Sequence, residues 1–120
     1  MQDFRDLKVW ELSRELAIEI YQATAAFPKD ERYGLTSQIR RSCTSIPANI
    51  AEGCGRATSP DLIRFLHIAL GSASELESHL ILAHDLGFID PAGFRPLLDR
   101  LARLKRMLGA LIRTIRISNP

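Results

Sequence analysis

Apolar residues recur every three or four positions along most of the 120-residue chain, which is the spacing of one face of an α-helix. No window alternates apolar and polar residues with period two, so no strand is expected. The pattern predicts four helices, separated by short connections. Consecutive helices should then be antiparallel neighbours, and we expect an all-α, up-down-up-down four-helix bundle in a single domain over residues 1–120.

The limits of the four predicted helices carry residues typical of helix ends. The first helix runs from residue 4 to about residue 26 and stops at Phe27-Pro28, because the residue before a proline is pushed out of the α region. The last helix runs to about Ile117. The other expected limits are N-caps at Asp30 and at Thr58 or Ser59, ends at Gly53 or Gly55 and at Gly87, and a start at Asp90-Pro91.

Pro47 stands inside the second predicted helix. It has no N–H for the carbonyl of Cys43, and a proline in a helix interior costs about 3 kcal/mol. The apolar spacing nevertheless continues through it, at Leu35, Ile39, Cys43, Ile46 and Ile50. We therefore expect one helix kinked at Pro47, with Asn49 donating to the freed carbonyl of Cys43.

The helices carry more apolar positions than one core needs. The seam of the third helix is Leu62, Leu66, Ala69, Ala73, Leu76, Leu80 and Ala83, and that of the last is Phe94, Leu97, Leu101, Leu104, Leu108, Leu111 and Ile115. The surplus positions are Leu7, Trp10, Ala17 and Tyr21 on the first helix, with Leu98, Met107, Ile112 and Ile117 on the last. Self-association would use this surplus, and we expect Leu7, Trp10 and Tyr21 to be contacts between copies.

A polar stripe lies beside the apolar one on the second helix, at Gln38, Ser42, Ser45, Asn49 and Glu52. Small residues around Gly71 in the third helix would let a neighbouring helix approach closely. We therefore place Ser72, Glu75 and His79 opposite the stripe, as a hydrogen-bonded seam beside the core.

Charge is unevenly distributed along the chain. Its formal net charge is +2, but residues 1–90 hold 9 Lys/Arg and 13 Asp/Glu, whereas residues 91–120 hold 7 Lys/Arg and one acid, Asp99. The outer face of the last helix carries Arg95, Arg103, Arg106, Arg113 and Arg116, flanked by Arg100 and Lys105.

Two interpretations of these arginines stay open. Arginines in a row can follow the phosphates of RNA or DNA, and the absence of interleaved aromatic residues favours backbone contact over base stacking. Alternatively, the row pairs with acids of a neighbouring copy, such as Glu11, Glu15 and Glu19.

The chemistry-bearing residues give no sign of catalysis. The only metal-like spacing is Glu75 to His79, which lacks the further ligands of a di-iron bundle, and no histidine is placed near Cys43 or Cys54. We expect no enzymatic activity, cofactor, metal or small-molecule substrate, and two buried, unbridged cysteines. No apolar run is long enough for a membrane span or a signal core, so a cytoplasmic protein is expected.

Several motifs resemble those of one known family. They are Phe4-x-x-Leu7-x-x-Trp10, Phe27-Pro28 followed by Tyr33-Gly34-Leu35, Gln38-Ile39-Arg40-Arg41, Ser45-Ile-Pro-Ala-Asn-Ile-Ala-Glu-Gly53, and Ala69-x-Gly71-Ser72-x-x-Glu75-Leu76-Glu77. The chain resembles, over nearly its whole length, the four-helix-bundle proteins encoded in intervening sequences of 23S ribosomal RNA genes, also labelled S23 ribosomal proteins.

This resemblance implies a ring-like homopentamer without enzymatic activity. It also implies a relation to the accessory variability determinant of diversity-generating retroelements, a basic pentameric barrel that binds nucleic acid and a reverse transcriptase. The matching motif residues Ser45, Pro47, Asn49, Glu52, Gly53 and Glu75 take a structural role by this resemblance. We therefore expect a homo-oligomer that binds RNA or DNA through the last helix, or else a scaffold for protein interactions.

Overall fold

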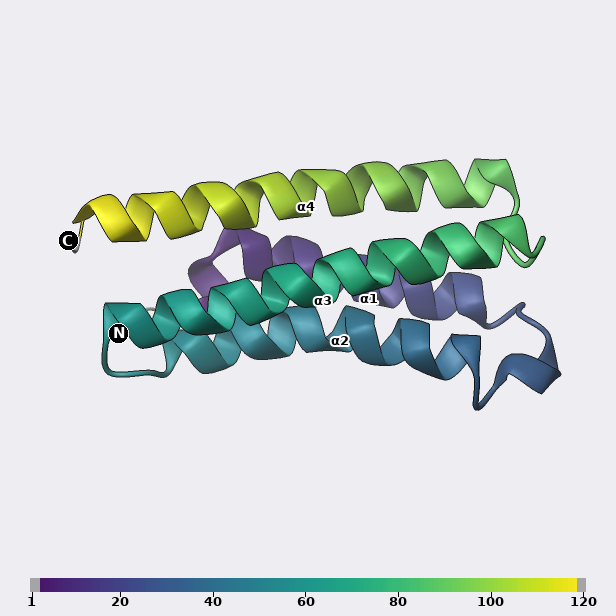
Figure 1. Ribbon diagram of the computed structural model, residues 1–120, viewed down its shortest axis with the longest axis horizontal. Coiled ribbons are helices and arrows are strands. Elements are labelled where there is room, and N and C mark those ends of the chain that lie inside the picture. Colours follow the sequence, from purple (N-terminus) through teal and green to yellow (C-terminus); the bar gives the residue numbers. More distant parts are fainter. Residues whose placement is uncertain (1–2, 119–120) are drawn as a thin grey trace.

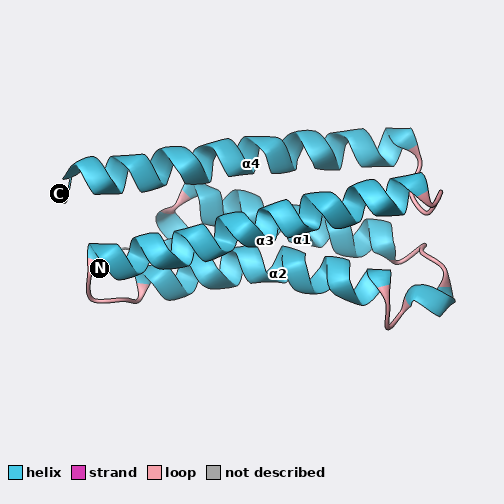
Figure 2. Cartoon of the chain, viewed as in Figure 1, coloured by secondary structure: helices cyan, strands magenta, loops and turns pink. Residues whose placement is uncertain are grey.

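Four α-helices and no strand make up residues 3–118, which are the residues that the computed structural model describes (Figures 1 and 2). The α-helices are α1 (Lys8–Thr24), α2 (Leu35–Cys54), α3 (Ser59–Asp85) and α4 (Pro91–Ser118). Two short 3-10 helices, η1 (Phe4–Asp6) and η2 (Lys29–Glu31), precede α1 and α2. The all-α class is therefore confirmed.

Successive helices run in opposite directions in Figure 1, as expected for an up-down bundle. Each helix packs against its two neighbours, α4 closing on α1, and no backbone contact joins α1 to α3 or α2 to α4 among the described residues. The α2–α3 contact is the most extensive and the α1–α4 contact the smallest. None of the described helices combines the length and hydrophobicity that crossing a membrane requires.

The predicted apolar seams form one core. The seams of α2 and α3 are buried except at their first positions, Leu35 and Leu62, which are half-buried. On α4 the last buried residue is Ile112, whereas the predicted Leu111 and Ile115 are only half-buried. The prediction that Ile112 lies outside the core is therefore wrong, because an α-helix of 3.6 residues per turn drifts away from a strict seven-residue repeat.

Two connections differ from the sequence prediction. The first helix is interrupted at Leu7, which is extended and separates η1 from α1. Asp30 is not the N-cap of α2, because it lies within η2 and the helix begins only after Gly34. The Glu31 carboxylate instead accepts from the N–H of Leu35 at 3.0 Å, so a residue from the preceding turn caps the helix.

The caps of α3 follow the sequence prediction. The Thr58 side chain accepts from the N–H of Asp61 at the start of the helix. At its end, Gly87 has a φ of 79°, and the N–H groups of Gly87 and Phe88 donate to the carbonyls of His84 and Ala83. This is a Schellman motif, which needs the left-handed backbone that glycine adopts without strain.

α2 continues through Pro47 as one helix. The side chain of Asn49 donates to the carbonyl oxygen of Ser45 at 2.8 Å and to its hydroxyl at 2.9 Å. The expected bond from Asn49 to the Cys43 carbonyl is therefore wrong, because the amide reaches the residue one turn back on its own face of the helix.

Gly53 lies in a close contact between α2 and α3. A Cβ atom added there would lie 2.9 Å from Cβ of Phe65 and 3.0 Å from Cδ1 of Leu62. Gly71 differs, since a Cβ there would have no neighbour within 4 Å. The small residue of this stretch that meets α2 is Ser72, which lies beside the fully buried Ala73, and Gly71 is exposed.

We expect Gly53→Ala to destabilise the fold by about 1–3 kcal/mol, because the added methyl group overpacks the α2–α3 contact and outweighs the better helix propensity of alanine. Gly71→Ala is the matched control and should stabilise by about 0.5–1 kcal/mol. Urea unfolding of both variants measures the difference. A neutral or stabilising Gly53→Ala would contradict the close approach.

Candidate functional site

The outer face of α4 presents all five predicted arginines to solvent. Each of Arg95, Arg103, Arg106, Arg113 and Arg116 is exposed. Within residues 3–118, no carboxylate pairs with any of them, although Arg116 lies 3.2 Å from the imidazole of His67. Arg95 and Arg116 are twenty-one residues apart, so the row spans about 32 Å along the helix.

The two flanking cations are used within the chain. Arg100 forms an ion pair with Glu19 of α1, and the ammonium of Lys105 donates to Glu77 of α3 at 2.8 Å. These pairs tie both sides of α4 to the bundle. Arg100 and Lys105 are therefore neutralised within the chain, whereas the five arginines of the row have no carboxylate partner in the described residues.

A groove between α1 and α4 brings one arginine of the row close to acids. It has a volume of about 270 Å³ and is lined by Leu12, Glu15, Glu19, Arg100 and Arg103. Arg103 therefore shares a groove with carboxylates of its own chain. Both glutamates belong to the set expected to meet the arginines of a neighbouring copy.

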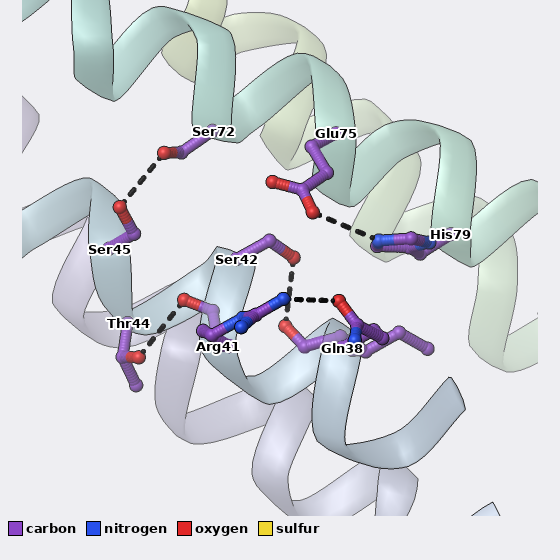
Figure 3. Close-up of polar contacts among 9 residues, drawn as sticks. Gln38, Arg41, Ser42, Thr44, Ser45, Ser72, Glu75 and His79 are labelled. Carbon is purple, nitrogen blue, oxygen red and sulfur yellow. Dashed lines mark hydrogen bonds and ion pairs between the residues drawn. The ribbon is translucent and has the colours of Figure 1, made fainter. Parts of the chain in front are cut away.

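The predicted polar seam between α2 and α3 forms in part (Figure 3). The hydroxyls of Ser45 and Ser72 lie 2.9 Å apart and join the two helices. Asn49 orients the Ser45 hydroxyl by donating to it. Ser72 is next to the buried Ala73 in sequence, so the Ser45–Ser72 hydrogen bond lies beside the core.

Other polar residues of the seam bond within their own helix. Glu75 lies 3.2 Å from the ring of His79, and Arg41 donates to Gln38 at 2.7 Å, as Figure 3 shows. Glu75 is exposed, as is Glu52 at the far end of the stripe. Among the described residues, the Ser45–Ser72 pair is therefore the one hydrogen bond that joins α2 to α3.

The residues expected at contacts between copies are exposed to different degrees. Leu7 and Trp10 are half-buried against the core, and Trp10 packs edge-on against Phe4 at 4.9 Å between ring centroids. Tyr21 is 42% exposed and lies under the guanidinium of Arg40, 4.5 Å from its ring centroid.

Exposed apolar residues that the sequence analysis missed gather on α1 and α3. They are Ile18 on α1, Ile68, Ile81 and Leu82 on α3, and Leu86 directly after α3, between 41% and 53% exposed. Ile68, Leu82 and Leu86 recur at 14 and 4 residues, so they share the side of α3 that carries Ser72 and His79. That spacing was available in the sequence but lay outside the seven-residue seam.

Both cysteines are buried and unbridged. Burial raises the pKa of the Cys43 thiol to about 11, against the opposing effect of Arg40, and burial also raises the pKa of Cys54. A thiol with a raised pKa is a poor nucleophile at neutral pH. Among residues 3–118, no three His, Cys, Asp or Glu side chains gather as metal ligands would.

Comparison with known proteins matches the chain to a protein family and to solved structures. The sequence model of the 23S rRNA-intervening sequence protein family matches residues 5–110. The chain is similar, at 29% identity and a TM-score of 0.78, to the crystal structure of a protein with unknown function from the S23 ribosomal protein family of Bacteroides thetaiotaomicron VPI-5482. That similarity covers 87% of this chain and 97% of the other. No curated protein matches the chain.

Because Cys43 is buried, the free energy of unfolding should decrease as the pH rises through the alkaline range. The unfolded thiol, with a pKa near 9.0, ionises before the folded one, at about 11. The unfolded state therefore loses its proton first, and stability should fall by on the order of 2 kcal/mol as the pH rises from 9 to 11. Urea unfolding across this range, compared with Cys43→Ala, isolates the effect. Identical pH slopes for the two proteins would contradict it.

Proposed function

Because the chain belongs to the 23S rRNA-intervening sequence protein family, we propose that it is a non-enzymatic homo-oligomer, a pentamer, that binds RNA or DNA through the basic face of α4. The observation that carries the proposal is the row of five exposed arginines without a carboxylate partner in the described chain. Arginine contacts phosphates in a planar, bidentate geometry, and a row of this length can follow a nucleic-acid backbone.

The distribution of exposed apolar residues supports a ring. A cyclic assembly of five copies uses a head-to-tail contact, in which two different surfaces of each copy meet. The α1 patch (Ile18 and Tyr21) and the α3 patch (Ile68, Leu82 and Leu86) lie on helices that occupy a diagonal of the bundle. In a ring, the two patches would each meet a different neighbouring copy.

A scaffold for protein interactions is the second candidate. Arg100 pairs with Glu19, and Arg103 lines the same groove as Glu15. Cations of α4 thus already lie next to acids of α1. In this alternative the exposed arginines pair with acids of a neighbouring copy or another protein and leave no surface for phosphates.

Charged substitutions in the α3 patch should break the assembly. Native mass spectrometry should detect pentamers of the wild-type protein and monomers of Ile68→Glu/Leu82→Glu, because buried carboxylates without partners are unfavourable at an interface. Tyr33→Glu is the control, since Tyr33 is 88% exposed and belongs to neither patch nor to the surplus apolar positions. Circular dichroism checks that the fold is retained. A monomeric wild-type protein at micromolar concentration would overturn the proposed assembly.

Removing arginines from the row should weaken nucleic-acid binding and its salt dependence. We expect Arg95→Ala/Arg106→Ala/Arg113→Ala to reduce the slope of log K against log salt by about 2–3, one phosphate contact per arginine. Fluorescence anisotropy with a labelled RNA at about 50 to 200 mM salt measures it.

The control for this experiment removes three exposed cations from other helices, Arg14→Ala/Arg41→Ala/Arg64→Ala. It should bind as the wild type does. Equal losses in both triple variants would indicate a general charge effect. An affinity of the wild type that does not change with salt, or no binding, would favour the scaffold.

A further inference from the structure

A cationic pocket lies where α1 ends and α2 begins. The inference drawn from it is independent of the proposed function. Its volume is about 410 Å³, within the range of small-ligand sites. The lining residues are Thr24, Ala25, Phe27, Pro28, Lys29, Arg32, Thr36 and Arg40. Three of them are cations and none is acidic. In the described part of the chain, no carboxylate pairs with these cations.

Arg40 is held in place on one wall of this pocket. Its Nε donates to the hydroxyl of Thr24 at 2.9 Å, and its Nη2 donates to the carbonyl of Tyr21 at 3.3 Å. The guanidinium also stacks on the ring of Tyr21. These contacts fix its orientation and leave Nη1 for a ligand, so little side-chain entropy would be lost on binding.

Thr36 provides a second, independent sign of a ligand. Thr36 is 8% exposed, and its hydroxyl oxygen is closed to solvent and has no hydrogen-bond partner among the described residues. An unpaired buried hydroxyl costs about 1–3 kcal/mol, and a ligand oxygen would recover this cost once the side chain turns its hydroxyl into the pocket. The nearby Glu31 carboxylate does not compete for the cations, because it caps α2 at the N–H of Leu35.

We infer that this pocket binds a phosphate monoester group. A dianionic phosphate can accept from Arg40, Lys29 and Arg32 together, and the Thr36 hydroxyl adds a neutral donor. Ala25, Phe27 and Pro28 give the pocket an apolar edge for the rest of the ligand. Phe27 is fixed by its ring contact with Phe88, at 5.7 Å between centroids. The group could belong to a small phosphorylated molecule or to the end of a nucleic-acid strand.

Isothermal titration with inorganic phosphate, at constant ionic strength, tests the site. We expect saturable binding by the wild type and at least about tenfold weaker binding by Lys29→Ala/Arg32→Ala, since hydrogen bonds to charged groups are lost. Thr36→Val should also weaken binding without lowering the melting temperature, because it removes a hydroxyl that has no partner. Arg95→Ala/Arg106→Ala/Arg113→Ala leaves the pocket intact and should bind phosphate as the wild type does.

Ribose 5-phosphate, and one RNA oligonucleotide with either a 5′-phosphate or a 5′-hydroxyl, distinguish the two sources. Preference for the 5′-phosphorylated strand supports a strand end, and binding of ribose 5-phosphate without such a preference supports a small ligand. No saturable phosphate binding up to about 10 mM, or unchanged affinity in both pocket variants, would overturn the inference.

Discussion

Close packing of α2 against α3 is the contact on which the rest of the structure depends. Gly53 leaves room for Phe65, and the buried Ala73 allows the helices to approach along their middle. Because the backbones are so near, two short hydroxyl side chains, Ser45 and Ser72, can meet between them. Larger residues at these positions would separate α2 from α3. They would also shift α1, which packs against α2, and α4, which packs against α3.

The division of cations on α4 follows from this arrangement. Residues at the sides of the helix, Arg100 and Lys105, face carboxylates on the adjacent helices and are neutralised there. The five arginines of the row are exposed, and no carboxylate of the described chain pairs with them, so they keep their charge in solvent. A chain with a formal net charge of only +2 therefore presents one strongly basic face.

Local signals predicted much of this fold, and longer-range geometry limited the rest. The seven-residue repeats identified most of the core, and Thr58 and Gly87 marked their helix ends because each cap involves only nearby residues. The start of α2 could not be read in the same way, because Asp30 is equally suited to a 3-10 turn. The arginine row followed from helical spacing alone. The phosphate pocket did not, since it joins Thr24 to Arg40 across two helices and a turn.

The smallest helix contact, between α1 and α4, also joins the most distant parts of the chain. The other three pairings connect consecutive helices and require only short loop closures, whereas this one must bring residues near both termini together. It therefore carries the largest entropic cost of loop closure for the smallest contact between two helices. During folding, α2 and α3 can associate early, with the α1–α4 seam and its Arg100–Glu19 pair completing the bundle last. The same seam is the natural place for the native bundle to open first.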